Sequence, residues 1–429
     1  MRTACPPAAA VAFAAALSLI IQPAAADVLV VEPSGLGDHT EIADAVAAAS
    51  SGDTVLVKAG TYDAFTITKD LRVVADDGAA VVVQGPIGVN SVPGGTVWIQ
   101  GLQATGTQGV AVAFGSGLFA LSTDAHIRVQ DCVLTGAEGV DPGTGLGFHK
   151  EGWDGVRLFQ CSDVVFVDCQ ITGGKGHNVS DPFNCCNPGD IGGSGIYSLN
   201  SRFAVYFSTL TGGEGGTGDV SGGDGGDGCT LTMNSSLYAA GTTFAGGDGG
   251  DAEDFLGAPP PGDGGDGLFV ESNSTAQLLD CSFAGGAGGF AFVFGLFGDD
   301  GQPLTNLGTV VNLPGTAQRL SMPSPVRENT AFNLIFEGEP GGSVFLGVTQ
   351  ATDFLPFLGL GGIIHLSPIP VAIPLGVVPP GGVLTVPASL GSLAPGVEAA
   401  DFYLQAFTAG PSGALLTAPW HVLALDSAF

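Results

Sequence analysis

Three short segments rich in glycine and aspartate hold the densest set of potential metal ligands in the chain. They read GGDGGDG from Gly222, GGDGGD from Gly246 and GDGGDG from Gly262. Ca²⁺ prefers oxygen ligands, and glycine lets the backbone turn sharply and present its carbonyl groups. No Lys, Arg or His occurs between Phe203 and Gln318, so these carboxylates repel one another unless solvent or a hard cation intervenes. The candidate Ca²⁺ ligands are Asp224, Asp227, Asp248, Asp251, Asp263 and Asp266, and the alternative is that these residues line solvated surface loops.

A second set of residues could bind a sugar polymer. Aromatic rings offer apolar faces on which pyranose rings stack, and an arginine can pair with a uronate carboxylate. The alternative is burial, because large exposed apolar patches usually have a cover or a partner. The candidate binding residues lie at outward positions of short predicted strands or beside them: Phe119, Trp153, Arg157, Phe159, Tyr197 and Phe269.

A third set lies in two polar segments, HKEGWD from His149 and KGH from Lys175. They contain Lys150 and Lys175, which are half of the lysines in the chain, together with His177. The two segments fall in adjacent repeats, so we expect them to be spatial neighbours.

These residues are positioned by a sequence repeat that runs from Gly117 to Gly289. Five units begin at Gly117, Gly155, Gly195, Gly228 and Gly267, and each opens with a short strand, continues through a polar turn to a second strand and closes on a tail such as TGGKG. The extra length of each unit follows this tail as a Gly/Asp-rich insertion. Insertions at one point of every unit are typical of stacked solenoid coils. Strands stacked at about 4.8 Å would place the insertions in a column. We therefore predict an all-β fold built as a parallel β-helix.

The segment TEIADAVAAASSGDTVLVKAGTY, residues 40–62, predicts a short helix followed by a strand. It resembles the opening coil of the pectin-lyase-like β-helix superfamily. The resemblance implies a right-handed parallel β-helix with a short N-terminal helix that covers its open end.

The resemblance also implies a candidate chemistry. Polysaccharide lyases of this superfamily use Lys or Arg as a base beside a uronate carboxylate that a cation neutralises. Lys150 or Lys175 would be that base, with His177 or Asp181 as a helper. However, the Arg-x-x-Arg and calcium motifs of pectate lyases, the paired-Asp and Gly-His-Gly pattern of polygalacturonases, and the motifs of pectin methylesterases do not occur in the sequence. The alternative is an ordinary pair of polar loops.

The ends of the chain predict export and a second module. Arg2, an apolar run and Ala24-Ala25-Ala26 have the layout of a signal peptide, 1–26, which predicts a secreted or cell-surface protein without membrane insertion after cleavage. The β-helix is predicted over 27–303. Residues 304–429 are richer in proline and contain period-2 apolar stretches, so we predict a C-terminal all-β module, sandwich-like in form.

Charge and cysteine content restrict the partners. The formal net charge of −30 makes nucleic acid and anionic membranes poor partners. Seven cysteines follow the predicted signal peptide, without zinc-motif spacing, and are predicted to be buried thiols or disulfides. Two functions remain open: a non-catalytic protein that binds polysaccharide or a cell-surface partner, with Ca²⁺ as a candidate stabilising ion, and a lyase of acidic polysaccharide.

Overall fold

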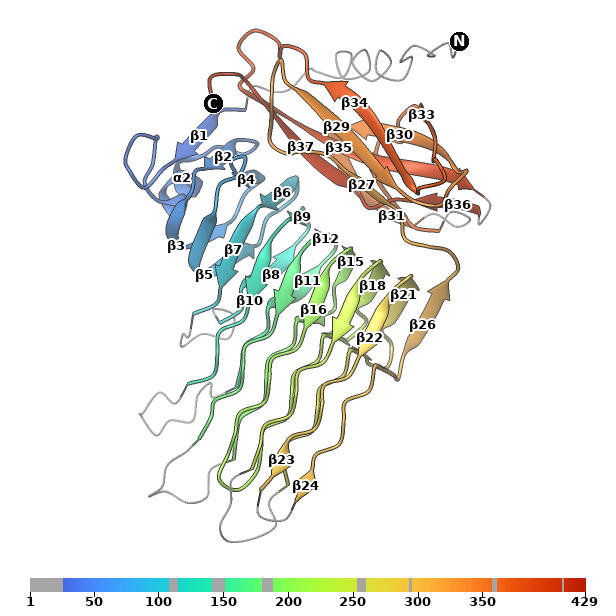
Figure 1. Ribbon diagram of the computed structural model, residues 1–429. Helices are drawn as coiled ribbons and strands as arrows, with labels where there is room; N and C mark the ends of the chain where they lie inside the picture. The colour runs from blue at the N-terminus through green and yellow to red at the C-terminus, as the bar shows by residue number, and fades with distance from the viewer. Residues whose placement is uncertain are drawn as a thin grey trace.

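The computed structural model describes residues 26–107, 115–140, 151–179, 188–252, 260–292, 295–356, 361–410 and 413–429. The chain is all-β, and the described part contains one short helix, α2 (Ile42–Ala48) (Figure 1). No described helix has the length and apolarity needed to cross a membrane. Residues 1–25 of the predicted signal peptide, Lys150, Asp181, Cys185 and Cys186 lie outside the described residues.

The N-terminal three-quarters of the chain forms stacks of parallel strands. The first sheet has ten strands in the order β1 (Val28–Val31), β2 (Thr54–Val57), β4 (Leu71–Ala75), β6 (Thr96–Gln100), β9 (His126–Gln130), β12 (Val164–Val167), β15 (Arg202–Tyr206), β18 (Ser236–Ala240), β21 (Thr275–Leu279) and β26 (Thr309–Leu313). Each strand pairs in parallel with the next, because successive coils return to the same edge of the sheet.

The second sheet has two arms that share the long strand β5 (Val81–Asn90), which also pairs with β3 (Gly60–Ile67). The first arm contains β7 (Leu102–Thr105), β10 (Val133–Thr135), β13 (Gln170–Thr172), β16 (Thr209–Thr211), β19 (Thr243–Ala245) and β22 (Ser282–Ala284). The second arm contains β8 (Leu118–Thr123), β11 (Val156–Cys161), β14 (Ile196–Leu199), β17 (Cys229–Thr232), β20 (Leu268–Val270) and β25 (Leu304–Asn306). Successive coils thus contribute one strand to the first sheet and one to each arm, an arrangement compatible with a β-helix.

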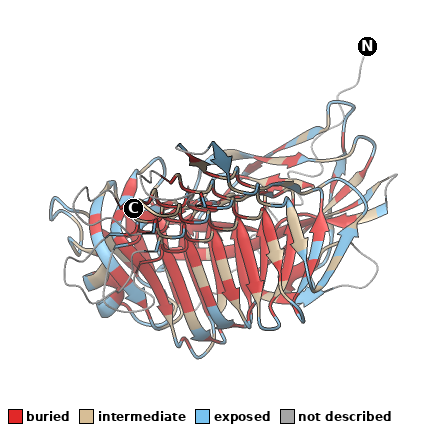
Figure 2. Cartoon of the chain, turned by 90° about the horizontal axis from the view of Figure 1, so that it is seen from below, coloured by how far each residue is buried: buried red, intermediate tan, exposed pale blue. Residues whose placement is uncertain are grey.

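The strand register follows the predicted repeat. Val156 of β11 pairs with Leu118 of β8 on one side and with Ile196 of β14 on the other. The predicted inward residues at these positions are fully buried, and most residues of the stacked strands are buried as well (Figure 2). Vertical ranks of Val, Ile and Leu therefore form one continuous core.

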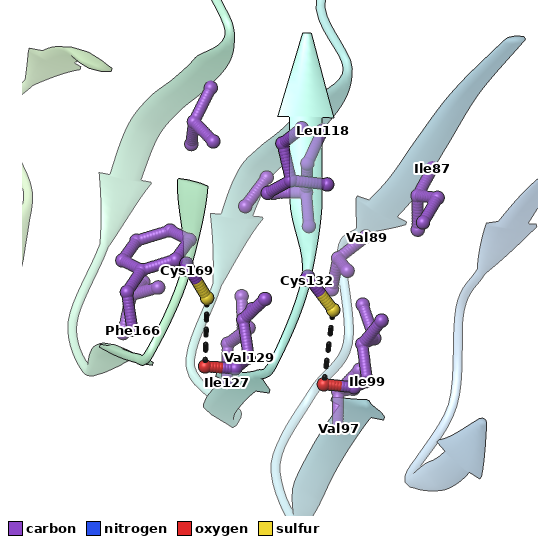
Figure 3. Packing of buried hydrophobic residues seen from close by; sticks show 14 of the residues in the cluster. Ile87, Val89, Val97, Ile99, Leu118, Ile127, Val129, Cys132, Phe166 and Cys169 are labelled. Carbon is purple, nitrogen blue, oxygen red and sulfur yellow. Dashed lines mark hydrogen bonds between the residues drawn. The ribbon is translucent and has the colours of Figure 1, made fainter. Parts of the chain in front are cut away.

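Cysteines in the stack act as small apolar residues. Cys132 and Cys169 point into the core, where their thiols lie 3.8 and 3.6 Å from the carbonyl oxygens of Ile99 and Val129 (Figure 3). Burial raises the pKa of Cys132 to about 12. The described cysteines are all free thiols: Cys132, Cys161, Cys169, Cys229 and Cys281.

The two ends of the stack are closed differently. At the N-terminal end, Ile42, Ala45 and Val46 of α2 pack into the core beside the first coils. At the other end, the parallel strands continue to Leu313, past the predicted limit at residue 303. In this last coil, the exposed Asn306 and Asn312 occupy strand positions that hold apolar residues in the preceding coil. A polar terminal repeat keeps the end of a solenoid soluble.

The C-terminal residues form mainly antiparallel sheets that cover the outer face of the first sheet (Figure 1). Val165, Tyr206 and Tyr238 of the first sheet share one hydrophobic cluster with Phe336, Phe402 and Trp420. The strands are β27 (Arg319–Ser321), β28 (Val326–Arg327), β29 (Ala331–Glu337), β30 (Ser343–Thr349), β31 (Ala351–Pro356), β32 (Ile363–Ser367), β33 (Ile373–Val377), β34 (Val383–Ser389), β35 (Ala399–Gly410), β36 (Gly413–Leu416) and β37 (Trp420–Leu425).

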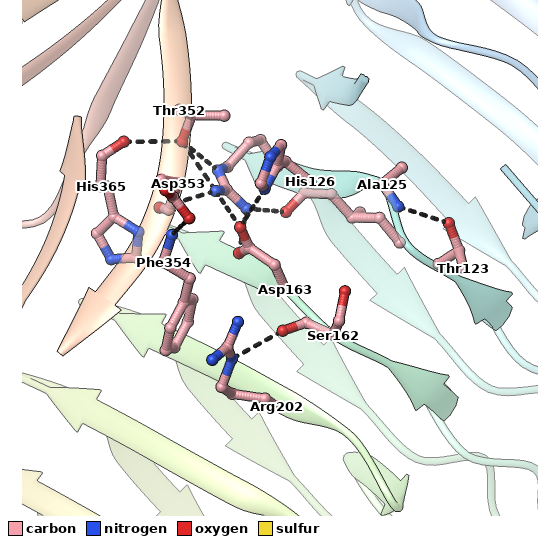
Figure 4. Close-up of polar contacts among 12 residues, drawn as sticks. Thr123, Ala125, His126, Ser162, Asp163, Arg202, Thr352, Asp353, Phe354 and His365 are labelled. Carbon is pink, nitrogen blue, oxygen red and sulfur yellow. Dashed lines mark hydrogen bonds and ion pairs between the residues drawn. The ribbon is translucent and has the colours of Figure 1, made fainter. Parts of the chain in front are cut away.

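A buried ion pair lies within this interface. Arg128 and Asp163 are 1% and 2% exposed, and the guanidinium contacts both carboxylate oxygens at 2.6 and 2.8 Å. Figure 4 shows Asp163 beside His126 and near Thr352, whose hydroxyl accepts a hydrogen bond from Arg128. Burial alone would raise the pKa of Asp163, but Arg128 and His126 hold it well below its usual range.

Candidate functional site

The predicted insertions form a bundle of extended segments that leaves one corner of the stack (Figure 1). We call it the glycine bundle. Its first layer follows the first arm of the second sheet and contains residues 136–139, 173–178, 212–218, 246–251 and 285–291. Its second layer leads back into the second arm and contains residues 152–155, 189–195, 222–228, 262–267 and 298–301. The insertions therefore stack in a column, as the repeat predicted.

Backbone hydrogen bonds in the glycine bundle follow a three-residue rule. In the triplet Gly212-Gly213-Glu214, the first amide donates within the layer, to the Ala245 carbonyl at 2.9 Å. The second amide donates across the layers, to the Gly193 carbonyl at 2.8 Å. The third position points outward. Successive residues of each segment therefore point in three different directions before the pattern repeats. This is the geometry of an extended helix with three residues per turn.

This packing leaves no room for side chains at the glycines between the layers. A Cβ at Gly213 would lie 1.9 Å from the Gly174 carbonyl oxygen, and one at Gly226 would lie 2.0 Å from that of Gly193. Glycine is required here for the same reason as at the crowded axis of collagen.

The outward aspartates accept hydrogen bonds from the backbone amides at the third position of the triplets. Asp227 accepts a hydrogen bond at 2.9 Å from the Asp266 amide in the next coil, and Asp266 accepts one at 2.7 Å from the Gln302 amide. All six candidate Ca²⁺ ligands make such a bond with one carboxylate oxygen: Asp224, Asp227, Asp248, Asp251, Asp263 and Asp266. Segment 285–291 is the last of the first layer, so no further coil of that layer needs capping. The positions that hold aspartate in earlier segments are Ala287 and Phe290 here.

Within the described residues, no group of three or more His, Cys, Asp or Glu side chains is arranged to hold a metal ion. Ca²⁺ binding by the aspartates therefore stays a prediction. The structure adds a second explanation for their spacing, which is backbone capping.

Substitution at Asp227 separates the two explanations. Asparagine keeps an acceptor oxygen but removes the charge, so capping predicts that Asp227→Asn leaves the melting temperature nearly unchanged. Asp227→Ala leaves the Asp266 amide without its acceptor and should cost about 1–3 kcal/mol. Thermal melts of both variants in EDTA and in excess Ca²⁺ are the measurement. A Ca²⁺-dependent stabilisation of the natural protein that Asp227→Asn abolishes would instead favour ion binding.

The glycine bundle creates a concave corner on each side where it leaves the stack. The first groove, of about 440 Å³, lies against the first arm and is lined by Thr135, Thr172, Thr211, Lys175 and Glu214 among others. The second, of about 350 Å³, lies against the second arm. We call the second one the corner cleft, and it is lined by Glu151, Trp153, Asp154, Arg157, Ile191, Ser194 and Tyr197, with the backbone of Gly152, Gly192 and Gly193.

Arg157 is the central side chain of the corner cleft. Its Nε lies 2.9 Å from Oδ2 of Asp154, and its guanidinium lies over the Tyr197 ring with Cζ 5.1 Å from the centroid. The other oxygen of Asp154 accepts a hydrogen bond at 3.0 Å from the Ser194 amide. Burial raises the pKa of Asp154 from its ordinary value, and Arg157 opposes that shift. Arg157 is thus held over an aromatic ring by contacts with Asp154 and Tyr197.

The structure brings together three of the six predicted sugar-binding residues. Trp153, Arg157 and Tyr197 line the corner cleft, with Trp153 6% exposed and the other two half-buried. Phe119 is 3% exposed and packs over Gly88. Phe159 is 37% exposed but does not line the cleft, and Phe269 is half-buried two coils beyond Tyr197. The C-terminal strands cover the outer face of the first sheet, and not the second arm that carries these predicted sugar-binding residues.

Of the predicted catalytic residues, Lys150 lies outside the described residues, and the two described ones, Lys175 and His177, do not line the corner cleft. Lys175 lines the opposite groove, where its ammonium forms an ion pair with Glu214 at 2.9 Å. His177 Nδ1 lies 3.9 Å from an Asp190 carboxylate oxygen. The two polar segments are neighbours as expected, because the Gly174 amide donates to the Trp153 carbonyl at 2.7 Å. Glu151, Trp153 and Asp154 nevertheless line the corner cleft, whereas Lys175 lines the opposite groove.

Sequence reasoning did not single out Asp154 and Ser194 of the corner cleft. A signal for them exists in the repeat. The residue before the opening glycine is Asp154, Ser194, Asp227 or Asp266 in four successive units, and hydrogen bonds between segments align these positions.

Comparisons with known proteins do not identify a family. No known protein family matches the chain, and no curated protein matches it. Among solved structures, a superoxide reductase (neelaredoxin) from Ignicoccus hospitalis is similar over 26% of this chain and 81% of that chain, with 12% identity and a TM-score of 0.16. This likeness is too slight to bear on fold or function.

Proposed function

We propose that this protein is a secreted or cell-surface β-helix protein that binds polysaccharide without catalysis. In this proposal the stack is a right-handed parallel β-helix of the pectin-lyase-like kind, and the C-terminal strands form a sandwich-like module on its side. The observation that carries the proposal is the corner cleft, in which Trp153, Arg157 and Tyr197 meet. Aromatic rings beside a fixed donor group are suited to stack and orient sugar rings.

The position of the cleft favours an extended ligand. The cleft lies in a corner between the second arm and the glycine bundle, and both elements continue through the following coils. A polymer could therefore enter and leave along the axis of the stack. The half-buried hydroxyl of Ser194, which also contacts the Thr230 hydroxyl at 3.0 Å, would supply a further hydrogen bond to a sugar hydroxyl.

Two features favour binding over lyase chemistry. A general base must lie within hydrogen-bond reach of the proton that it removes. Lys175 is instead paired with Glu214 in the opposite groove, and Arg157 is paired with Asp154. In this proposal the protein has no nucleic-acid or membrane partner, because its net charge of −30 repels both polyanions and anionic lipid surfaces. Ca²⁺ is proposed only as a stabilising ion.

The test is substitution of Tyr197, whose ring is partly exposed in the cleft. We expect Tyr197→Ala to weaken polysaccharide retention about tenfold, equivalent to about 1.4 kcal/mol, because the stacking surface is lost. Tyr197→Phe keeps the ring and should keep most of the binding. The measurement is affinity electrophoresis in gels that contain single polysaccharides, with thermal melts as a folding control. Retention that is equal in Tyr197→Ala and the natural protein would exclude the corner cleft as the binding site.

A further inference from the structure

The charge distribution around the corner cleft restricts the class of sugar that it could bind. The positive charge of Arg157 is already matched by Asp154, whose carboxylate lies 2.9 Å from Nε. Among the described residues that line the cleft, the one further charged group is Glu151, which is exposed. Among the described residues that line it, the cleft therefore carries one negative charge in excess and offers no unmatched cation to a uronate.

The wall beyond the cleft is more acidic still. Hydrogen bonds within the second layer align Glu151 with Ile191, Asp224, Asp263 and Asp299 in the following coils. Asp224, Asp263 and Asp299 are exposed, and each lies in the stretch between Phe203 and Gln318 that lacks Lys, Arg and His. A polymer that follows the corner from Tyr197 toward Phe269 would run beside these carboxylates.

We infer that the corner cleft selects uncharged glycans and rejects acidic ones, an inference that rests on the proposed function. An uncharged sugar can stack on Tyr197 and share its hydroxyl protons with the Arg157–Asp154 pair, since this pair presents both donors and acceptors. An acidic polymer makes the same contacts but meets a like charge at each of the three coils beyond Tyr197, from Asp224, Asp263 and Asp299. The discrimination arises from the acidic wall rather than from the cleft itself.

The experiment measures binding of two sets of hexasaccharides to the full protein by isothermal titration calorimetry. Uncharged probes are the hexamers of cellulose, xylan and mannan, and acidic probes are the hexamers of galacturonate and mannuronate. The titrations are made at about 10 mM ionic strength, where the Debye length is about 30 Å. Tyr197→Ala is titrated in parallel to establish which binding occurs in the corner cleft.

The double variant Asp224→Asn/Asp263→Asn tests the cause. Asparagine keeps the oxygen that accepts the amide hydrogen bonds of Asp263 and Asp299, so the bundle should remain folded while the wall loses two charges. We expect uncharged hexamers to bind the natural protein at least tenfold more tightly than acidic ones. In the double variant the ratio of the affinity for uncharged hexamers to that for acidic hexamers should fall, because only the acidic hexamers bind more tightly.

The outcomes distinguish the inference from the proposed function. Acidic hexamers that bind as tightly as uncharged ones, in a manner that Tyr197→Ala abolishes, would overturn the inference and leave the proposed function standing. A ratio unchanged in the double variant would overturn the role of the acidic wall. Binding of neither class, or binding that Tyr197→Ala does not affect, would overturn the proposed function and the inference with it.

Discussion

The variant Gly213→Ala is expected to disrupt the glycine bundle and to destabilise the protein by about 3 kcal/mol or more, because a methyl group has no space beside the neighbouring segment of the same layer. Its Cβ would lie 1.9 Å from the Gly174 carbonyl oxygen, a backbone atom that no rotamer change can move away. The segment would have to shift, and the bonds from the Gly213 amide to Gly193 and from the Gly226 amide to Gly213 would be stretched or lost. Each lost bond adds about 0.5–1.5 kcal/mol.

The matched control is Gly391→Ala, in the connection between β34 and β35, where a Cβ would meet no heavy atom within 4 Å. We expect this control to melt at the temperature of the natural protein. Thermal melts monitored by circular dichroism report global stability, and limited proteolysis followed by mass spectrometry reports opening of the bundle alone. Equal melting temperatures and equal proteolysis of the two variants would contradict the two-layer packing.

The second large effect is expected from Asp163→Asn, which leaves the buried Arg128 without a counter-charge. Arg128 is 1% exposed, so water cannot replace the lost carboxylate. Breaking a buried ion pair from one side typically costs about 3–5 kcal/mol. The loss should appear first in the attachment of the C-terminal strands, because Arg128 also donates to the Thr352 hydroxyl and the Asp353 carbonyl.

The matched control is Glu214→Gln, which is the same kind of substitution in the exposed ion pair with Lys175. Exposed pairs contribute about 0–1 kcal/mol, so this variant should be nearly neutral. The double variant Arg128→Met/Asp163→Leu should recover part of the stability lost in Asp163→Asn, because it removes both buried charges. Urea denaturation of all three variants measures the differences. A cost for Glu214→Gln as large as that for Asp163→Asn would show that the Arg128–Asp163 pair has no special role in the interface.

Functional residues were predicted less completely than the strands. Trp153, Arg157 and Tyr197 were predicted from residue type and repeat position, and they do share the corner cleft. Lys175 was predicted to lie near them because its segment falls in the adjacent repeat, yet its side chain lines the opposite groove. An extended segment with three residues per turn sends neighbouring side chains to different sides, and sequence distance alone does not reveal which side.

The acidic triplets illustrate the same limit. Gly-Gly-Asp reads as a flexible loop with a metal ligand when one segment is considered alone. In the stack, Asp227 accepts the amide of Asp266 from a segment one coil later. This role exists only when successive coils are stacked within a layer, because the amide that needs an acceptor belongs to another coil.

The sequence by itself determined the repeat, the all-β class and the inward residues such as Leu118, Val156 and Ile196, because these follow from the two-residue alternation of a strand and from its recurrence along the chain. The tertiary structure decided which outer faces are covered. Strands such as TVWIQ and VVFV are buried on both faces, which their nearly continuous apolar residues indicate in retrospect. Arg128 in HIRVQ looks like a solvent-exposed charge, but Asp163 from the next coil and Thr352 from the C-terminal strands enclose it. Local periodicity encodes which side of a strand faces the core, whereas the partner of the other side comes from residues far along the chain and is known only once the chain has folded.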